Sequence, residues 1–362
     1  MQYATLNTLV LHYFNTPYTK MRLKKELKMK QVTDGIYQIE THYMDQEGIA
    51  ACYLIEDNGE IAFVETNTNH AVPFLLAAVN YLGFKPDQVK YVIVSHIHLD
   101  HAGGTGLLMK QLPLAELVVH ARGRKHMINP EKLIDGVKQV YGEKKYKKLY
   151  GEILPIDKER VRSIMGDDTL TLGKRTLDLY DSQGHAKHHM FVFDRQTQSV
   201  FSGDAFGIGY PRFAFDNFRL VFPSTAPVQF EPERSLETFQ NIMDLNPSRV
   251  LLTHFGSIED TTNAHEQLKE WIAFSVEIAE NRYDQGYREN ELYDKLYKDI
   301  AGRFEQVIKK ARGVGLTPEE KEFLFLDSDL NAQGLAHYIK KLKYKQPTEH
   351  TENTEKKATN NK

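Results

Sequence analysis

Apolar and polar side chains recur along the chain with the short periods of a mixed α/β protein. Residues 35–40 alternate between apolar and polar side chains, which predicts a strand. Two apolar runs at 51–55 and 60–64 flank an Asp-Asn-Gly sequence at 57–59, which favours a hairpin turn. The continuous apolar run at 91–94 is typical of a buried strand. The first hundred residues therefore predict a sheet.

The same patterns continue to residue 285. Further strands are predicted at 117–120, 169–172, 176–181, 191–194, 199–202 and 249–253. Helices are predicted at 69–83, 105–112, 124–150, 232–245 and 260–285. Strands that alternate with helices define the α/β class, and no repeat of a solenoid period is evident.

The pattern and the composition divide the chain into four predicted parts. The segment from Lys20 to Lys30 carries six basic residues and one acidic residue, which favours a solvated arm. Two or three amphipathic helices are predicted at 289–309 and 318–343, with Asp327 or Ser328 as the cap of the last one. The four parts are an appendage at 1–30, an α/β body at 31–286, a helical extension at 287–345 and a disordered polar tail at 346–362.

Composition excludes several kinds of partner and site. The formal net charge of -3 gives no reason to expect nucleic acid as a partner. No apolar run approaches the roughly 20 residues that cross a bilayer, so we expect no membrane insertion. We see neither a basic segment followed by an apolar one at the start nor a second cysteine beside Cys52, and we expect a cytoplasmic protein. A metal site in this chain must therefore use His and carboxylate ligands.

The densest cluster of candidate ligands follows the apolar run at 91–94. His96 and His98 are two residues apart, so their imidazoles point the same way in an extended segment. Asp100 and His101 follow where the chain must turn, before two glycines that permit a tight bend. Four candidate ligands within six residues predict a metal site.

Three more candidate ligands come directly after predicted strands. His185 follows the strand at 176–181, Asp204 the strand at 199–202, and His254 the strand at 249–253. The ends of neighbouring strands lie at one rim of a sheet, where α/β proteins assemble their sites. We therefore expect these side chains to join the first cluster.

In chain order these motifs resemble those of the metallo-β-lactamase superfamily. The motifs are His96-x-His98-x-Asp100-His101, Gly184-His185-x3-His189, Ser202-Gly203-Asp204 and Thr253-His254. The resemblance spans about residues 32–258 and implies an αββα sandwich with a dinuclear site at one edge of its two sheets.

The resemblance also implies the metals and their ligands. It implies two zinc ions per chain, with iron or manganese as alternatives. The implied ligand set is His96, His98 and His185 for the first metal, Asp100, His101 and His254 for the second, and Asp204 as the bridge. It makes His189 a supporting residue that hydrogen-bonds within the site. For His188 we expect exposure to solvent, and for His120 a structural role.

The implied activity is hydrolysis by a hydroxide that bridges the two metals. Asp100 would orient that hydroxide and carry its proton. Members of this family act on many substrates, and a small ester, thioester or lactone is our prediction. The charge balance disfavours RNA, and the lack of a signal peptide disfavours an exported lactamase. Tyr210, Arg212 and His126 are candidate substrate contacts.

Two other interpretations remain open at this point. Ser202-Gly-Asp-Ala-Phe-Gly207 is similar to a stretch of the flavodiiron proteins, which carry two irons in the same fold and act in redox or oxygen binding. Those proteins usually have Glu where this chain has His98. In a non-catalytic interpretation, the C-terminal helices mediate binding or homo-oligomer formation and the metal is structural.

Overall fold

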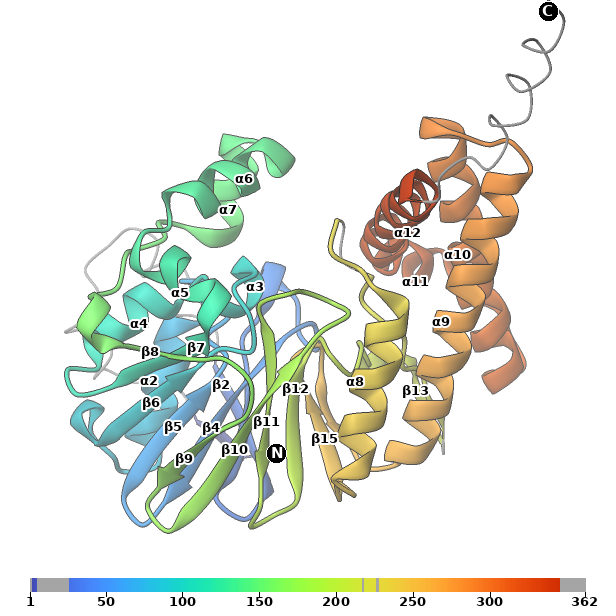
Figure 1. Cartoon of the computed structure of the whole chain (residues 1–362). Helices are drawn as coiled ribbons and strands as arrows, with labels where there is room; N and C mark the ends of the chain where they lie inside the picture. The colour runs from blue at the N-terminus through green and yellow to red at the C-terminus, as the bar shows by residue number, and fades with distance from the viewer. Residues whose placement is uncertain (1, 5–25, 217, 226–227, 346–362) are drawn as a thin grey trace, which may run out of the picture.

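Two β-sheets packed face to face form the centre of the computed structural model, which describes residues 2–4, 26–216, 218–225 and 228–345 (Figure 1). The first sheet has eight strands that lie side by side in sequence order. They are β1 (Gln2–Ala4), β2 (Leu27–Thr33), β3 (Ile36–Glu40), β4 (Ala51–Asp57), β5 (Glu60–Val64), β6 (Val89–Ile93), β7 (Glu116–His120) and β8 (Val161–Ile164). Pairing is antiparallel from β1 to β5 and parallel from β5 to β8.

The second sheet has six strands in the order β16-β15-β12-β11-β10-β9. Their bounds are β9 (Asp168–Leu172), β10 (Arg175–Ser182), β11 (His189–Asp194), β12 (Ser199–Gly203), β15 (Arg249–Leu252) and β16 (Gly256–Ile258). β12 and β15 are parallel, and the other neighbours are antiparallel. A separate two-stranded ribbon joins β13 (Ala214–Phe215) and β14 (Phe218–Arg219).

Local sequence explains why these strands pair as they do. Asn58 and Gly59 connect β4 and β5 with φ angles of 50° and 82°, the conformation that a two-residue hairpin turn requires. Alternate residues of β4, such as Tyr53 and Ile55, are buried between the two sheets. The Tyr53 hydroxyl donates a hydrogen bond of 2.6 Å to the carbonyl of Leu252 in the second sheet. The two sheets are thus joined by an apolar layer and a polar contact.

Helices cover both outer faces, which completes an αββα sandwich (Figure 1). On the first sheet are α2 (Val72–Tyr81), α4 (Thr105–Gln111) and α5 (Ala121–Ile128), and on the second are α8 (Pro232–Asp244) and α9 (Thr261–Asp284). The short helix α3 (Leu99–Ala102) packs against α6 (Glu131–Tyr141) and α7 (Glu143–Tyr150) through Leu99, Tyr146 and Tyr150. Short 3-10 turns lie at Tyr43–Asp45, Pro86–Gln88, Lys158–Arg160 and Pro211–Phe213.

The C-terminal region is helical, as predicted. It consists of α10 (Glu289–Arg312), α11 (Pro318–Phe323) and α12 (Phe325–Lys345), which share one apolar core with α8 and α9. Our prediction that Asp327 or Ser328 caps the last helix is wrong, because α12 begins at Phe325. The preceding helix, α11, has Thr317 as its cap, and Thr317 forms a capping box with Glu320.

The N-terminal boundary also differs from the predicted one. β2 begins at Leu27, and Leu27 and Met29 alternate as buried residues in the first sheet, so residues 27–30 are not an appendage. The charged neighbours of these two residues hid this alternation. Residues 5–25 and the predicted tail at 346–362 lie outside the described residues. The division at 286–287 stays a prediction. None of the described helices is long and apolar enough to cross a membrane.

A buried ion pair gives a test of the second sheet. Arg175 Nη1 lies 2.6 Å from Asp194 Oδ2, with the two side chains 1% and 0% exposed. Asp194→Ala leaves the guanidinium buried without its partner, so we expect a loss of about 3–5 kcal/mol in the free energy of unfolding. Chemical unfolding measures it. Lys90→Ala, which removes the half-exposed pair with Glu60, is the control and should cost less than about 1 kcal/mol. Equal losses of unfolding free energy in the two variants would contradict the view that the Arg175–Asp194 pair is buried and stabilising.

Candidate metal centre

Loops and the short helix α3 at one edge of the sandwich carry all seven predicted ligands. Residues 96–101 follow β6 of the first sheet. On the second sheet, His185 follows β10, Asp204 follows β12 and His254 follows β15. β12 runs parallel to β15, and β10 has the same direction because β11 lies antiparallel between β10 and β12. Their carboxyl ends therefore meet at one edge, as the sequence predicted.

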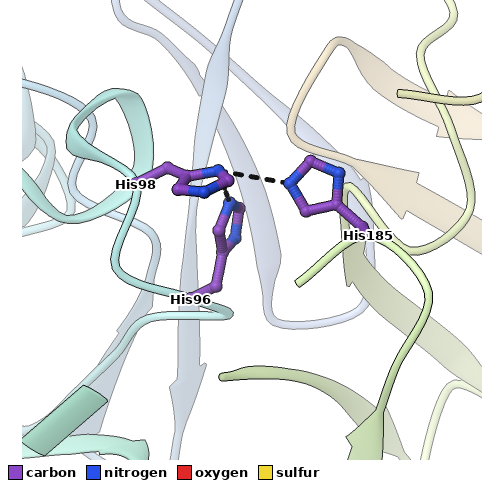
Figure 2. A group of neighbouring side chains, drawn as sticks. All are labelled: His96, His98 and His185. Atoms are coloured by element: carbon purple, nitrogen blue, oxygen red, sulfur yellow. Dashed lines mark hydrogen bonds between the residues drawn. The ribbon is translucent and has the colours of Figure 1, made fainter. Parts of the chain in front are cut away.

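Three histidine side chains form the first group (Figure 2). His98 Nδ1 lies 2.8 Å from His96 Nε2 and 3.2 Å from His185 Nε2. Two nitrogen ligands at about 2.0–2.1 Å from one tetrahedral zinc ion are about 3.3 Å apart. His96 and His185 are buried, whereas His98 is partly exposed. The three nitrogens lie close enough together to bind one cation, and the group reaches solvent at His98.

Asp100, His101 and His254 form the second group. Asp100 Oδ2 lies 3.4 Å from His254 Nε2 and 3.9 Å from His101 Nε2. His101 is fully buried, while the Asp100 side chain is 30% exposed. Asp100 is therefore the member of this group that solvent and a substrate can reach.

Asp204 lies between the two groups. Its Oδ2 is 3.5 Å from His185 Nε2 in the first group. Its Oδ1 is 3.2 Å from His101 Nε2 and 3.7 Å from His254 Nε2 in the second group. Each oxygen of the carboxylate faces a different group, which is the arrangement of a carboxylate that can bridge two metal ions.

The hydrogen bonds of the outer ring nitrogens leave the inner nitrogens ready to bind a metal. His185 Nδ1 lies 3.0 Å from the carbonyl of Ser224, and His254 Nδ1 lies 2.9 Å from the carbonyl of Ile49. A carbonyl only accepts, so each Nδ1 carries a hydrogen, and in the neutral ring each Nε2 then keeps a free lone pair. This pattern is the usual one around histidines that bind metals.

Two buried atoms at the centre lack well-aligned partners. Among the described residues, neither His101 Nε2 nor Asp204 Oδ1 makes a well-aligned hydrogen bond, although the two atoms lie 3.2 Å apart. Buried polar atoms are normally paired, and an exception calls for an explanation such as an ion. The donor set therefore fits one or more divalent cations.

Electrostatics divides the histidines into two kinds. Burial and the neighbouring histidines hold the pKa of His96 well below its ordinary value, and burial with His185 lowers the pKa of His98 to about 3. Burial also lowers the pKa of His101, but the carboxylates of Asp204 and Glu65 outweigh it and hold this pKa well above its ordinary value. Without a metal, a proton on His101 balances the buried carboxylates, and a bound cation would displace it.

Glu65 belongs to the site and was missed by the sequence analysis. It follows β5, is 1% exposed, and its Oε1 lies 3.1 Å from His101 Nδ1. The same oxygen accepts hydrogen bonds from the hydroxyls of Ser95 and Thr253. A carboxylate behind the outer nitrogen of a ligand histidine fixes the orientation of its ring. The signal in the sequence was an acidic residue directly after an apolar strand.

His189 holds the backbone of Asp204. Its Nε2 accepts a hydrogen bond of 3.2 Å from the backbone N–H of Asp204, and its Nδ1 lies 2.6 Å from the hydroxyl of Ser182. Gly203 precedes Asp204 at a φ of 53°, and a Cβ there would lie 2.7 Å from His189 Nε2. The turn that presents Asp204 therefore needs glycine at this position.

Two further histidines lie beside the site. Our expectation that His188 is exposed is wrong: it is partly buried, and its ring centroid lies 5.6 Å from that of His98. Burial and the neighbouring His185 lower its pKa to about 4. His120 Nε2 lies 2.8 Å from Asp181 Oδ1, a contact that joins β7 to β10 across the two sheets.

The candidate substrate contacts lie outside the two ligand groups. Tyr210 is 7% exposed, and its hydroxyl donates a hydrogen bond of 3.1 Å to Asp327 Oδ1 of α12. The exposed Arg212 stacks on Phe323 of α11 with 4.5 Å to the ring centroid. His126 lies partly buried in α5. Contact of these residues with a substrate stays a prediction.

Comparison with known families agrees with this geometry. The model of the metallo-beta-lactamase superfamily matches residues 45–254. This chain therefore belongs to the metallo-beta-lactamase superfamily, as the motifs predicted.

Individual relatives support the same fold. A metallo-beta-lactamase fold-containing protein of Sulfurisphaera tokodaii, ST1585, is 27% identical over 52% of this chain and 68% of its own length. Its crystal structure has a TM-score of 0.58 at 20% identity and covers 84% of this chain and 98% of that one. A family protein of Thermus thermophilus, TTHA1429, gives a TM-score of 0.59 at 17% identity, with coverage of 86% and 95%. The N-acyl homoserine lactonase AttM of Azorhizobium caulinodans is 32% identical over 34% of this chain and 43% of its own length.

Glu65 gives a test of the site's outer layer. Glu65→Ala removes the acceptor behind His101, and we expect metal affinity at the second group to fall about 10–100-fold. Competition with a coloured chelator measures it, and Glu65→Gln should lose less. Glu60→Gln alters a half-exposed acid at the start of β5, the strand that Glu65 follows, and serves as the control. Unchanged affinity in Glu65→Ala would show that Glu65 does not orient a ligand.

Proposed function

We propose that this protein is a hydrolase that uses two metal ions, with zinc as the metal, on a small ester, thioester or lactone. The observation that carries the proposal is Asp204, whose two carboxylate oxygens face two separate groups of ligands. The three nitrogens of the first group favour zinc, because imidazole suits it and their spacing matches a tetrahedral ion.

The chain's own residues supply binding and orientation. When bound, two divalent ions lower the pKa of water and polarise the oxygen of the substrate. The buried histidines hold these ions in place, and Glu65 and two backbone carbonyls fix the orientation of three imidazoles. The partly exposed Asp100 is the carboxylate that orients the attacking water and carries its proton.

The proposed class of substrate rests on two supports. One relative bears the name of a lactonase, although only 43% of it is covered. In addition, metal ions held by this donor set would activate water directly, so hydrolysis would need no covalent intermediate. An ester, thioester or lactone has one carbonyl carbon that water can attack. Hydrolysis then breaks the C–O or C–S bond, which releases an alcohol or a thiol from an ester or thioester and opens the ring of a lactone.

The test is a panel of substrates assayed with full-length protein loaded with zinc. We expect turnover of at least one lactone, ester or thioester, and two zinc ions per chain by metal analysis. Asp204→Ala removes the residue that faces both groups, so metal content and turnover should both fall sharply. Asp244→Ala, an exposed acid at the end of α8, is the control and should match the original protein.

Three outcomes would contradict the proposal. Two zinc ions in Asp204→Ala would overturn the bridging role of Asp204. Two bound zinc ions with no turnover of any substrate would favour a binding role. Protein that is purified with two irons and an iron charge-transfer absorption band would favour the redox alternative over the zinc hydrolase.

A further inference from the structure

One face of α12 lies against the segment that follows Asp204 in the chain. Asp327, Asn331 and Gly334 are spaced four and three residues apart, so they lie on the same side of the helix. Asp327 accepts a hydrogen bond from Tyr210, six residues after Asp204 in the chain. Asn331 and Gly334 both meet Thr225. Asp and Asn side chains on a helix normally face solvent. A helix face that turns these polar side chains toward loops of the site is therefore unusual.

Asn331 holds Thr225 through its side-chain oxygen and also through its backbone carbonyl, which lies 3.1 Å from the Thr225 hydroxyl. Its Oδ1 accepts from the backbone N–H of Thr225 at 2.7 Å, and it also lies 2.7 Å from the Thr225 hydroxyl. The two side chains are 8% and 2% exposed. Hydrogen bonds buried to this degree are costly to lose, because the donor left behind is not hydrated.

Thr225 connects directly to a histidine of the first group. The carbonyl of the preceding residue, Ser224, accepts the hydrogen of His185 Nδ1 at 3.0 Å. Ser224 and Thr225 lie in a stretch without regular secondary structure, so no strand or helix hydrogen bonds fix this carbonyl. Its position depends on contacts from outside the loop, and those of Asn331 act one residue away.

Gly334 allows the helix to come this close. A Cβ at this position would lie 1.9 Å from the carbonyl oxygen of Thr225 and 2.9 Å from its carbon. The close approach therefore places the backbone of α12 directly against the backbone of Thr225. A helix that needed only to cover the second sheet would not require this contact.

We propose that Asn331 is a positioning residue of the metal centre. By fixing Thr225, Asn331 holds the Ser224 carbonyl in place as the acceptor of His185 Nδ1. A residue of the helical extension thus orients a member of the first ligand group. The inference rests on the proposed function, because it takes His185 as a metal ligand. Residues that orient a ligand typically contribute 10–100-fold to metal affinity. Asn331 acts through one further residue, so we expect about tenfold.

The test compares full-length variants freed of metal and titrated with Zn²⁺ against a coloured chelator. Asn331→Ala should weaken one of the two binding steps about tenfold and leave the other unchanged. Asn331→Asp keeps the acceptor oxygen and should recover most of that loss. Gln333→Ala, an exposed position of the same helix, is the control and should bind like the original protein.

The outcomes separate this inference from a purely structural role and from the proposed function. If Asn331→Ala is folded and binds both ions with the original affinity, or if both steps weaken equally, the inference is wrong. If Asn331→Ala does not fold, Thr225→Val tests the same contact more gently, because it keeps the N–H bond to Asn331 and removes only the hydroxyl. An unchanged first site in Thr225→Val then overturns the inference. Original protein that binds no zinc would instead overturn the proposed function.

Discussion

Buried carboxylates among histidines are the constraint on which the rest of this structure depends. Asp204 and Glu65 are 7% and 1% exposed, and both lie at the edge where the two sheets meet. A buried carboxylate without compensation costs several kcal/mol, so this edge needs positive charge. A proton on His101 supplies some of it, and divalent cations held by the two ligand groups would supply more. The buried carboxylates therefore favour positively charged groups at this edge of the sandwich.

The layers of the sandwich serve this edge in different ways. Parallel strands of each sheet direct their carboxyl ends to it, and the loops and short helix that follow carry the predicted ligands. Outside the ligands, Glu65 and the carbonyls of Ile49 and Ser224 fix the imidazoles. Outside these, α12 holds the loop that contains Ser224. A helix far along the chain therefore contacts the loop that carries the acceptor of His185.

The sequence predicted the parts of the site that depend on local pattern. The cluster from His96 to His101, and single ligands directly after strands, could be recognised because period-two patterns identify the strands. The contacts of Glu65 and Asn331 could not, since each joins residues that are distant in sequence: 36 positions separate Glu65 from His101, and 106 separate Thr225 from Asn331. The misplaced helix cap at Asp327 has the same origin, because its partner Tyr210 is 117 residues away.

Anomalous diffraction from crystals soaked in zinc tests the central claim most directly. The account predicts two peaks about 3.5–4 Å apart, the separation of paired metal sites. One peak should lie among His96, His98 and His185, the other among Asp100, His101 and His254, with Asp204 contacting both. A single peak, or none at this edge of the sandwich in protein soaked with excess zinc, would contradict the account.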